Sequence, residues 1–382
     1  MSVGRAPALL QLAPRLERDE IGIGTLLLAR HARARGWRSF VASGGGPLLR
    51  ELAAAGATHL PLPLDVDGRL TRWRNADRIA RALAEHRIDL VHAQAIGPAL
   101  PGADAARAAG VALVVTVRDP ESVAPRRGLR AVTAAARVVA VSEYAKEEAV
   151  ARGVPAERVR VVRPGVDPAE FDPERVRGHR VLDLAERWQV PAEPGVILVP
   201  PLAPGDRGHL LLLRAMARVA RSDWIALLLG EIDEREGYRR ELMALMGRLG
   251  LAERVRFGGA VDDLPAALAL AGLVVLPCTR PDPAGTLAAA AQAMGRPVIV
   301  TSRGALAEAV MPAATGWLVP PDDPAELARA LELALGMDEA TRRRLAARAR
   351  TFVAAEFGVE RGCDRILALF QEVLSPPLAR TG

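Results

Sequence analysis

Residues 281–297 read PDPAGTLAAAAQAMGRP, an order typical of an anion site at the start of a helix. A turn rich in proline and glycine precedes a short predicted helix that starts near Gly285 and Thr286. Backbone N–H groups at such a start bind phosphate, and Asp282 adds a carboxylate close by. Alanines 288–291 stand where polar groups facing a ligand would be expected. The segment therefore has the outline of a phosphate site but few side chains to hold a substrate.

Twelve short apolar segments alternate with stretches of helical period, as in parallel sheets covered by helices on both faces. In the first half, strands are predicted over 8–13, 39–44, 90–94, 112–117, 137–143 and 159–165, and helices between them include 24–36 and 74–87. In the second half, strands are predicted over 195–202, 225–230, 255–259, 273–278, 297–301 and 316–321. The predicted fold class is α/β, with two doubly wound domains. Ligands of such sheets bind at the C-terminal strand ends, so we expect the site in the cleft between the domains.

A segment rich in proline, arginine and glutamate, about 171–194, carries no strand pattern and predicts the domain boundary. We therefore expect one domain over 1–176 and a second over 177–359. Residues 338–374 are strongly helical, with a break at Phe357-Gly358. The last part, about 360–382, is expected to return to the first domain and complete it.

The composition is basic and poor in aromatic residues. The chain has 51 Lys and Arg against 45 Asp and Glu, a formal charge of +6, with 3% aromatic residues. So few aromatic residues, with no helix-turn-helix pattern, argue against nucleic-acid binding. Lys146 is the only lysine, which favours coding bias as the source of the basicity. Two arginine groups remain candidates for a membrane-facing patch: Arg126, Arg127 and Arg130, then Arg342, Arg343, Arg344, Arg348 and Arg350.

Cysteine usage and the N-terminal segment predict the compartment. Cys278 and Cys363 form no disulfide framework and have no metal-ligand companions at useful spacing, which favours a reducing cytoplasm. The start MSVGRAPALLQLAPRL has a short apolar run broken by Gln11 and Pro14, which predicts a strand and not a signal peptide. A cytoplasmic protein is expected, with peripheral contact at the inner face of the membrane left open.

Four strings together resemble the family-4 glycosyltransferases, in order and at the expected spacing over nearly the whole chain. They are VSEYAKEEAVARGVPAERVRVV (141–162), VVRPGVDPAEFDPERV (161–176), VDDLPAALALAGLVVLP (261–277) and AAQAMGRPVIVTSRGALAEAVMPAATGWLVPPDDPAELARAL (290–331). The resemblance implies the GT-B architecture of two facing Rossmann-like domains. It also implies transfer of a sugar from a nucleotide donor with retention of anomeric configuration, and without a bound metal or other cofactor.

The resemblance implies which positions would bind the donor diphosphate. The family pattern after the first strand of the second domain is Gly-Arg, four residues, then Lys-Gly, and here that place reads PPLAPGDRGH (200–209). Arg207 and Gly208 match Lys-Gly, whereas Pro201 and Leu202 replace Gly-Arg. Arg207 is thus the expected diphosphate cation.

A second family motif has two glutamates separated by seven residues, and Asp282 and Ala290 occupy those places. Asp282 is the expected catalytic carboxylate near the sugar, with Gly285 and Thr286 at the diphosphate. Ala290 lacks the carboxylate expected to hold the donor ribose. Glu308 matches a family glutamate that follows a glycine pair, or else is an exposed helix residue.

In the first domain the family commonly has a glycine pair after Pro-Arg-Leu-Glu, and here Asp19 and Glu20 hold those places in PRLERDEIGIGT (14–25). Two carboxylates there would repel a diphosphate. Gly22 and Gly24 are the candidate donor-binding glycines if the loop has shifted.

Arg118, in TVRDPES (116–122), occupies the position of a family histidine on the acceptor side and is the second expected catalytic residue. His92 matches a histidine often seen in relatives, although a histidine at a strand end is more often structural.

Two hypotheses follow from these departures. The chain is a divergent active glycosyltransferase, whose partners are a nucleotide-sugar and a glycan or lipid-linked acceptor of the cell envelope. Alternatively, it is a catalytically inactive relative that acts as a scaffolding or regulatory partner. The donor base, the sugar, the acceptor and the oligomeric state are not encoded in any of these motifs.

Overall fold

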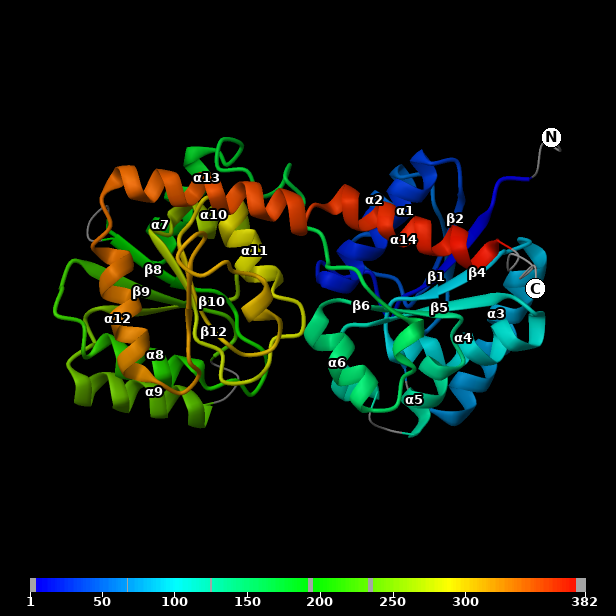
Figure 1. Ribbon diagram of the computed structural model, residues 1–382, viewed down its shortest axis with the longest axis horizontal. Helices are drawn as coiled ribbons and strands as arrows, with labels where there is room; N and C mark the ends of the chain where they lie inside the picture. Colours follow the sequence, from blue (N-terminus) through cyan, green and yellow to red (C-terminus); the bar gives the residue numbers. More distant parts are fainter. Residues whose placement is uncertain (1–4, 67, 124–125, 192–194, 233–235, 376–382) are drawn as a thin grey trace, which may run out of the picture. The chain divides into compact units, whose positions relative to one another are not determined.

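The computed structural model describes residues 5–66, 68–123, 126–191, 195–232 and 236–375. The chain forms two compact units, Met1–Gly165 with Val359–Gly382, and Val166–Gly358. The division after Gly165 lies earlier than the predicted boundary at 176, because Val166, Phe171 and Val176 pack in the core of the second unit. Each unit contains one parallel sheet with helices on its faces, so the predicted α/β fold class is confirmed (Figure 1).

The first unit has a seven-stranded sheet in the order β3-β2-β1-β4-β5-β6-β7. Its strands are β1 (Ala8–Leu12), β2 (Arg38–Ser43), β3 (Thr58–Pro61), β4 (Leu90–Ala93), β5 (Ala112–Val117), β6 (Arg137–Ala140) and β7 (Val159–Val161). Its helices are α1 (Glu20–Ala34), α2 (Leu49–Ala54), α3 (Arg69–Glu85), α4 (Ile96–Ala109), α5 (Arg126–Thr133), α6 (Glu143–Ala151) and α14 (Val359–Leu374), with 3₁₀ turns at Pro120–Val123 and Ala156–Arg158.

The C-terminal helix α14 packs on the first unit, as expected. Phe370 is fully buried and joins Leu9 of β1 and Leu28 of α1 in one core cluster. Figure 1 shows α14 beside α1 on one face of the sheet, with α4 and α5 on the other. The rings of Trp37 and His92 lie 6.1 Å and 5.1 Å from the ring of Phe370.

The second unit repeats this topology with six strands in the order β10-β9-β8-β11-β12-β13. The strands are β8 (Gly195–Val199), β9 (Trp224–Leu229), β10 (Val255–Gly259), β11 (Leu273–Leu276), β12 (Val298–Thr301) and β13 (Trp317–Val319). The helices are α7 (Gly178–Arg187), α8 (Gly208–Met216), α9 (Glu236–Leu249), α10 (Leu264–Leu270), α11 (Thr286–Ala293), α12 (Pro324–Leu335) and α13 (Glu339–Glu356), with a 3₁₀ turn, η3, at Ala305–Glu308.

Successive side chains of β8 point to opposite faces of the sheet and contribute to two separate cores in the second unit. Val196 and Leu198 face the cluster that contains α7, α10, α11 and α13, whereas Ile197 and Val199 face α8, α9 and α12. Both faces of the sheet are therefore buried, which is why its strands read as unbroken apolar runs.

Every predicted strand is present, and one further strand, β3, carried no clear pattern. Its sequence is Thr58-His59-Leu60-Pro61, at the edge of the sheet, and none of its side chains is fully buried. An edge strand tolerates proline and exposes one side to water, so it lacks the apolar run that marked the other strands.

Two helices begin earlier than predicted. α1 starts at Glu20 because Asp19 caps it, accepting a hydrogen bond from the Gly22 N–H. α3 starts at Arg69, five residues before the predicted range. The sequence pattern missed its first turns because their apolar residues are out of phase with the buried face of the helix.

No helix in the described part of the chain is long and apolar enough to cross a membrane.

Phe370→Ala should lower the free energy of unfolding of the first unit by about 3–5 kcal/mol, because it leaves a cavity beneath α14. Urea unfolding followed by tryptophan fluorescence measures this, with Trp37 as the local reporter. Gln371→Ala, at the exposed neighbouring position, is the control and should change stability by less than about 0.5 kcal/mol. Equal stability of Phe370→Ala and the wild type would contradict the packing of α14 described above.

Candidate functional site

In the second unit, the buried carboxylate of Asp206 joins the loop after β8 to the loop after β11. Its Oδ1 accepts hydrogen bonds from the Gly208 N–H at 2.7 Å and from Thr279 Oγ1 at 3.0 Å. Its Oδ2 accepts one from the Arg280 N–H at 3.0 Å, and the Thr279 N–H lies 3.1 Å from both oxygens. Asp206 is 4% exposed, so these donors replace water around a buried charge.

Arg207, the expected diphosphate cation, follows this carboxylate and occupies the N-cap position of α8, without a side-chain capping hydrogen bond. Its N–H donates to Thr279 Oγ1 at 3.1 Å. Its guanidinium forms an ion pair with Glu241 and lies over the ring of Tyr238, 5.2 Å from the centroid. The side chain is 55% exposed, so this pair is weak and an anion can take the place of Glu241. Gly208 is required here, because a Cβ would lie 2.2 Å from the Pro277 carbonyl oxygen.

Asp282, the expected catalytic carboxylate, turns toward its own backbone. Its Oδ1 accepts hydrogen bonds from the N–H groups of Ala284 at 2.9 Å and Gly285 at 2.6 Å. Its carbonyl accepts one from the Ala305 N–H at 2.7 Å, which joins this loop to the segment after β12. The carboxylate thus shapes the turn into α11.

The N-terminus of α11 has no side-chain cap, because the capping position is Gly285. Gly285 has a φ of +68°, and a Cβ there would lie 2.8 Å from the Cβ of Ala309. Thr286 Oγ1 is buried and makes no hydrogen bond within the described residues. The predicted residues Gly285 and Thr286 therefore sit at a helix start whose N–H groups have no acceptor from a capping side chain. Glu308 is half-buried at the end of η3, which packs against this turn.

Ala290 and Leu202, the two positions that lack the family's charged residues, belong to apolar packing. Ala290 is 2% exposed within the core beneath α11, and Leu202 packs partly buried against both cores of the second unit. A carboxylate at residue 290 would be buried in that core, so the loss of the charge is matched by its surroundings.

In the first unit, Glu20 and Arg118, two of the three residues that depart from the family pattern, bind each other. Arg118 Nη1 lies 2.6 Å from Glu20 Oε1, and Arg118 Nη2 donates to Gln94 Oε1 at 3.1 Å. The Arg118 side chain is 16% exposed, which makes this pair better shielded from water than that of Arg207. The carboxylate of Glu20 therefore does not stand free to repel an anion, and the charge of Arg118 is already neutralised.

A buried amide and imidazole network extends from this pair. Gln94 Nε2 donates to Gln11 Oε1 at 2.7 Å, and Gln11 Nε2 donates to the Thr25 carbonyl oxygen at 3.1 Å. His92 Nε2 lies 2.8 Å from Thr116 Oγ1, at zero exposure. These contacts favour the structural interpretation of His92.

Gly22 and Gly24 lie in the first two turns of α1 and not in a shifted loop, which corrects that expectation. A Cβ at residue 22 would lie 2.0 Å from the Glu17 carbonyl oxygen, and a Cβ at residue 24 would lie 3.2 Å from Arg118 Nη2. Both glycines therefore make room for the chain's own groups.

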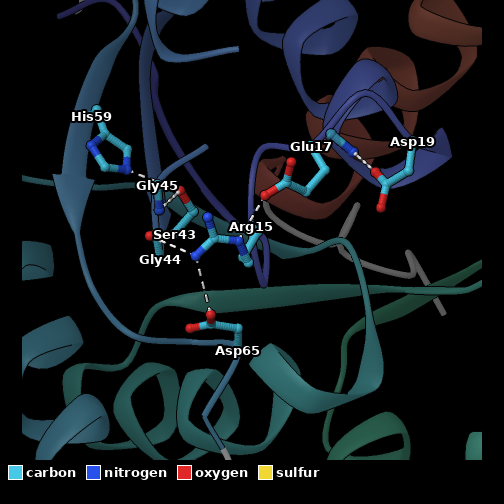
Figure 2. Close-up of polar contacts among 9 residues, drawn as sticks. Arg15, Glu17, Asp19, Ser43, Gly44, Gly45, His59 and Asp65 are labelled. Atoms are coloured by element: carbon cyan, nitrogen blue, oxygen red, sulfur yellow. Dashed lines mark hydrogen bonds and ion pairs between the residues drawn. The ribbon is translucent and has the colours of Figure 1, made fainter. Parts of the chain in front are cut away.

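Arg15 joins the C-terminal ends of β1, β2 and β3. Its Nε lies 2.8 Å from Glu17 Oε1, and its Nη1 lies 3.4 Å from both the Gly44 carbonyl oxygen and Asp65 Oδ2. Beside it, Ser43 Oγ lies 2.9 Å from His59 Nε2, as Figure 2 shows. These contacts hold the loop that precedes α1 against the neighbouring strands.

Burial lowers the pKa of His59, His92 and His209, and the effect is largest for His92 and His209. The pKa of His92 falls to about 3, through desolvation and then the positive charge of Arg118. That of His209 falls to about 4, through desolvation that the charge of Asp206 only partly offsets. Both are neutral at pH 7. Within the described residues, no group of three or more His, Cys, Asp or Glu side chains is arranged to hold a metal ion.

Asp206, Thr279 and the Glu20–Arg118 pair are the site features that the sequence motifs did not identify. The adjacency of Asp206 to Arg207 was visible in GDRGH, but nothing in that string indicates a bond to Thr279, 73 residues away. Opposite charges at residues 20 and 118 were likewise visible, and only the sheet brings them together.

Comparisons with known proteins give the relatives of the chain. Residues 193–336 match the family described as Glycosyl transferases group 1, and residues 21–170 match Glycosyltransferase Family 4. D-inositol 3-phosphate glycosyltransferase 1 of Catenulispora acidiphila is 31% identical over 344 residues, covering 83% of this chain and 80% of the relative.

Two further similarities are more limited: one covers only part of a relative, and the other is a similarity of fold. D-inositol 3-phosphate glycosyltransferase of Salinispora tropica is 35% identical over 57% of this chain, and the chain spans about half of that relative, 47%. The structure of a glycosyltransferase from Rickettsia africae has a TM-score of 0.84 at 22% identity, covering 97% of this chain and 100% of that one. This last similarity concerns the fold alone.

Asp206→Asn should lower the stability of the second unit by about 1–3 kcal/mol or more, because the amide NH₂ would face backbone N–H donors. Thermal unfolding monitored by circular dichroism measures the effect. Asp223→Asn, which changes an exposed aspartate paired with Arg221, is the matched control. A Tm of Asp206→Asn equal to that of the control would contradict the role assigned to this carboxylate.

Stability should fall as the pH drops from about 6.5 to 4, because the unfolded chain takes up protons on His92 and His209 that the folded chain excludes. At pH 4.5 each histidine should account for a loss of about 2–3 kcal/mol relative to neutral pH. His209→Asn should remove the part of this loss that His209 causes, which urea unfolding at a series of pH values from 6.5 to 4 measures. His179→Asn, at an exposed position, controls for the loss of a histidine. An unchanged pH dependence in His209→Asn would overturn the assignment.

Proposed function

The chain belongs to family 4 of the glycosyltransferases, and from this premise we propose that it transfers a sugar from a nucleotide-sugar donor to a glycan or lipid-linked acceptor of the cell envelope, with retention. The observation that carries the proposal is the cluster at the β8 and β11 ends, which combines an exposed arginine with an uncapped helix N-terminus. That combination suits a diphosphate leaving group.

Donor binding would use Arg207 and the start of α11. Arg207 would exchange Glu241 for a diphosphate oxygen, a change that costs little because the ion pair is exposed. The Gly285 N–H already donates to Asp282, so the N–H groups of the first turn of α11 from Thr286 onward, with the unpaired Thr286 hydroxyl, would hold the other oxygens. As the bond to the sugar breaks, these groups would stabilise the charge that develops on the leaving diphosphate.

The sugar and the acceptor would be positioned by groups that the structure holds rigidly. Asp282 would act near the sugar through its second oxygen, since Oδ1 is engaged by two N–H groups. Arg118 would act on the acceptor side only if a ligand replaced Glu20 as its partner. This replacement is costly because Arg118 is only 16% exposed. The inositol phosphate named for two relatives makes D-inositol 3-phosphate a reasonable first acceptor to test.

A second candidate function, a catalytically inactive relative in a scaffolding or regulatory role, is favoured by the repacked positions. Ala290 and Leu202 contribute apolar contacts where the family has charged groups, and Glu20 neutralises Arg118. If these changes leave no donor affinity, the fold would serve to bind another protein.

Titration calorimetry of the purified protein with UDP, GDP and ADP distinguishes the two functions. We expect one nucleotide to bind, and Arg207→Ala to weaken that binding roughly 10-fold to 150-fold, the loss of one hydrogen bond to a charged group. Arg221→Ala, another exposed arginine in an ion pair of the second unit, should bind as the wild type does. Transfer from the sugar form of that nucleotide to D-inositol 3-phosphate is then measured by product mass.

Failure of all three nucleotides to bind would overturn the transferase proposal and favour the inactive relative. Binding that Arg207→Ala leaves unchanged would show that the nucleotide does not use this cluster.

A further inference from the structure

The start of α3 carries an exposed apolar surface on the first unit. Val66, Leu70 and Trp73 are 54%, 59% and 67% exposed. The described residues include seven large apolar side chains that are exposed, and three of them fall within this stretch of eight residues. Such clustering on the surface of a folded unit marks an interaction site.

Helical geometry explains why these side chains face outward. The inward face of α3 consists of Asn75, Ile79 and Leu83, which are buried. At 3.6 residues per turn, Leu70 and Trp73 lie on the opposite side of the helix from that face. Their exposure therefore belongs to the outer face, where a helix of a soluble domain normally carries polar residues.

Arginines border this apolar stripe. Arg69 and Arg74 are exposed on its two sides, with Arg78 one turn further on, and none of the three forms an ion pair with a described residue. Of the described carboxylates nearby, Asp77 pairs with Arg81 at 2.6 Å and Asp65 contacts Arg15 at 3.4 Å. Residues 65–81 contain five arginines and three aspartates, so the net charge of this stretch is positive.

We propose that Val66, Arg69, Leu70, Trp73 and Arg74, here called the α3 patch, dock the protein on an anionic lipid bilayer. Tryptophan and leucine flanked by arginine is the arrangement by which an interfacial helix enters the boundary between headgroups and acyl chains. The arginines would contact anionic headgroups while the apolar side chains lie between them.

Charge and side-chain type favour a bilayer over other occupants. A second copy of the α3 patch would bring arginines against arginines, which disfavours a symmetric dimer through this face. Single-stranded nucleic acid binds through rows of aromatic side chains, whereas this stripe has one tryptophan beside aliphatic Val66 and Leu70.

The α3 patch lies beside the edge of the sheet that carries the candidate site. α3 follows the C-terminal end of β3, and Asp65, next to Val66, contacts Arg15 in the loop that precedes α1 (Figure 2). Docking would therefore bring that edge of the first unit close to the bilayer surface. This inference goes beyond the transfer reaction and does not rest on it, because bilayer binding requires no donor.

Co-sedimentation of the full chain with vesicles tests the proposal. Phosphatidylcholine vesicles containing phosphatidylglycerol should bind the protein at low salt, and pure phosphatidylcholine vesicles should bind it much more weakly. Leu70→Ser combined with Trp73→Ser should weaken binding at least tenfold. Arg69→Gln combined with Arg74→Gln should weaken it roughly 25-fold, about fivefold for each arginine.

The matched control is Leu182→Ser combined with Leu333→Ser, at two exposed leucines of the second unit, 69% and 58% exposed. This variant should bind anionic vesicles as the wild type does. Equal loss in the control and in the Leu70/Trp73 variant would overturn the assignment to the α3 patch. So would equal binding to vesicles with and without phosphatidylglycerol.

Tryptophan fluorescence gives a second readout that does not depend on sedimentation. Of the five tryptophans, Trp73 alone is exposed among the described residues, so anionic vesicles should shift the emission to shorter wavelength. Trp73→Phe should abolish the shift while circular dichroism confirms an intact fold. A shift that persists in Trp73→Phe would overturn the proposal. So would a wild-type dimer that Leu70→Ser with Trp73→Ser dissociates, or tighter binding to a single-stranded oligonucleotide than to the vesicles.

Discussion

The reversal of strand order between β1 and β4, and again between β8 and β11, is the constraint from which both candidate sites follow. At each reversal, the two connections leave the sheet toward opposite faces, so the C-terminal ends of the central strands stay uncovered by helices. In the second unit this edge receives Arg207, Asp282 and the start of α11. In the first unit it receives Glu20, Gln94 and Arg118. The side chains at these strand ends determine the chemistry of each edge.

The charged side chains at these edges have partners within the chain, and the degree of burial determines how strongly each pair resists exchange with a ligand. Asp206 is surrounded by backbone N–H groups and a hydroxyl, so its charge supports the loops and is not available to a ligand. Arg118 and Glu20 pair with little exposure, whereas Arg207 and Glu241 pair in water. A charged ligand can thus replace the partner of Arg207 at low cost, but it must compete with a shielded pair at Arg118. The edge at β8 and β11 can therefore accept a charged ligand, whereas the charges at the edge at β1 and β4 are largely paired already.

Elements that are buried were predicted correctly from their apolar patterns, whereas the elements that were missed are exposed and lack such patterns. Strands buried on both faces, such as Ile197 to Val199, read as unbroken apolar runs, which is why their positions were predictable. β3 was missed because an edge strand needs no such run. The first turns of α3 were missed because Leu70 and Trp73 are out of phase with the buried face, and this same mismatch exposes them.

By itself, the sequence determined the α/β class, the number of domains, the family resemblance and the positions that depart from the family pattern. These depend on local composition and spacing, which the chain carries regardless of how it folds. Only the tertiary structure decided what the departures mean. Glu20 and Arg118 are 98 residues apart, and Asp206 and Thr279 are 73 apart, so their contacts exist only once the sheets are formed. Whether Ala290 faces a ligand or a core depends on how α11 packs, and hydrophobic burial of that helix places it in the core.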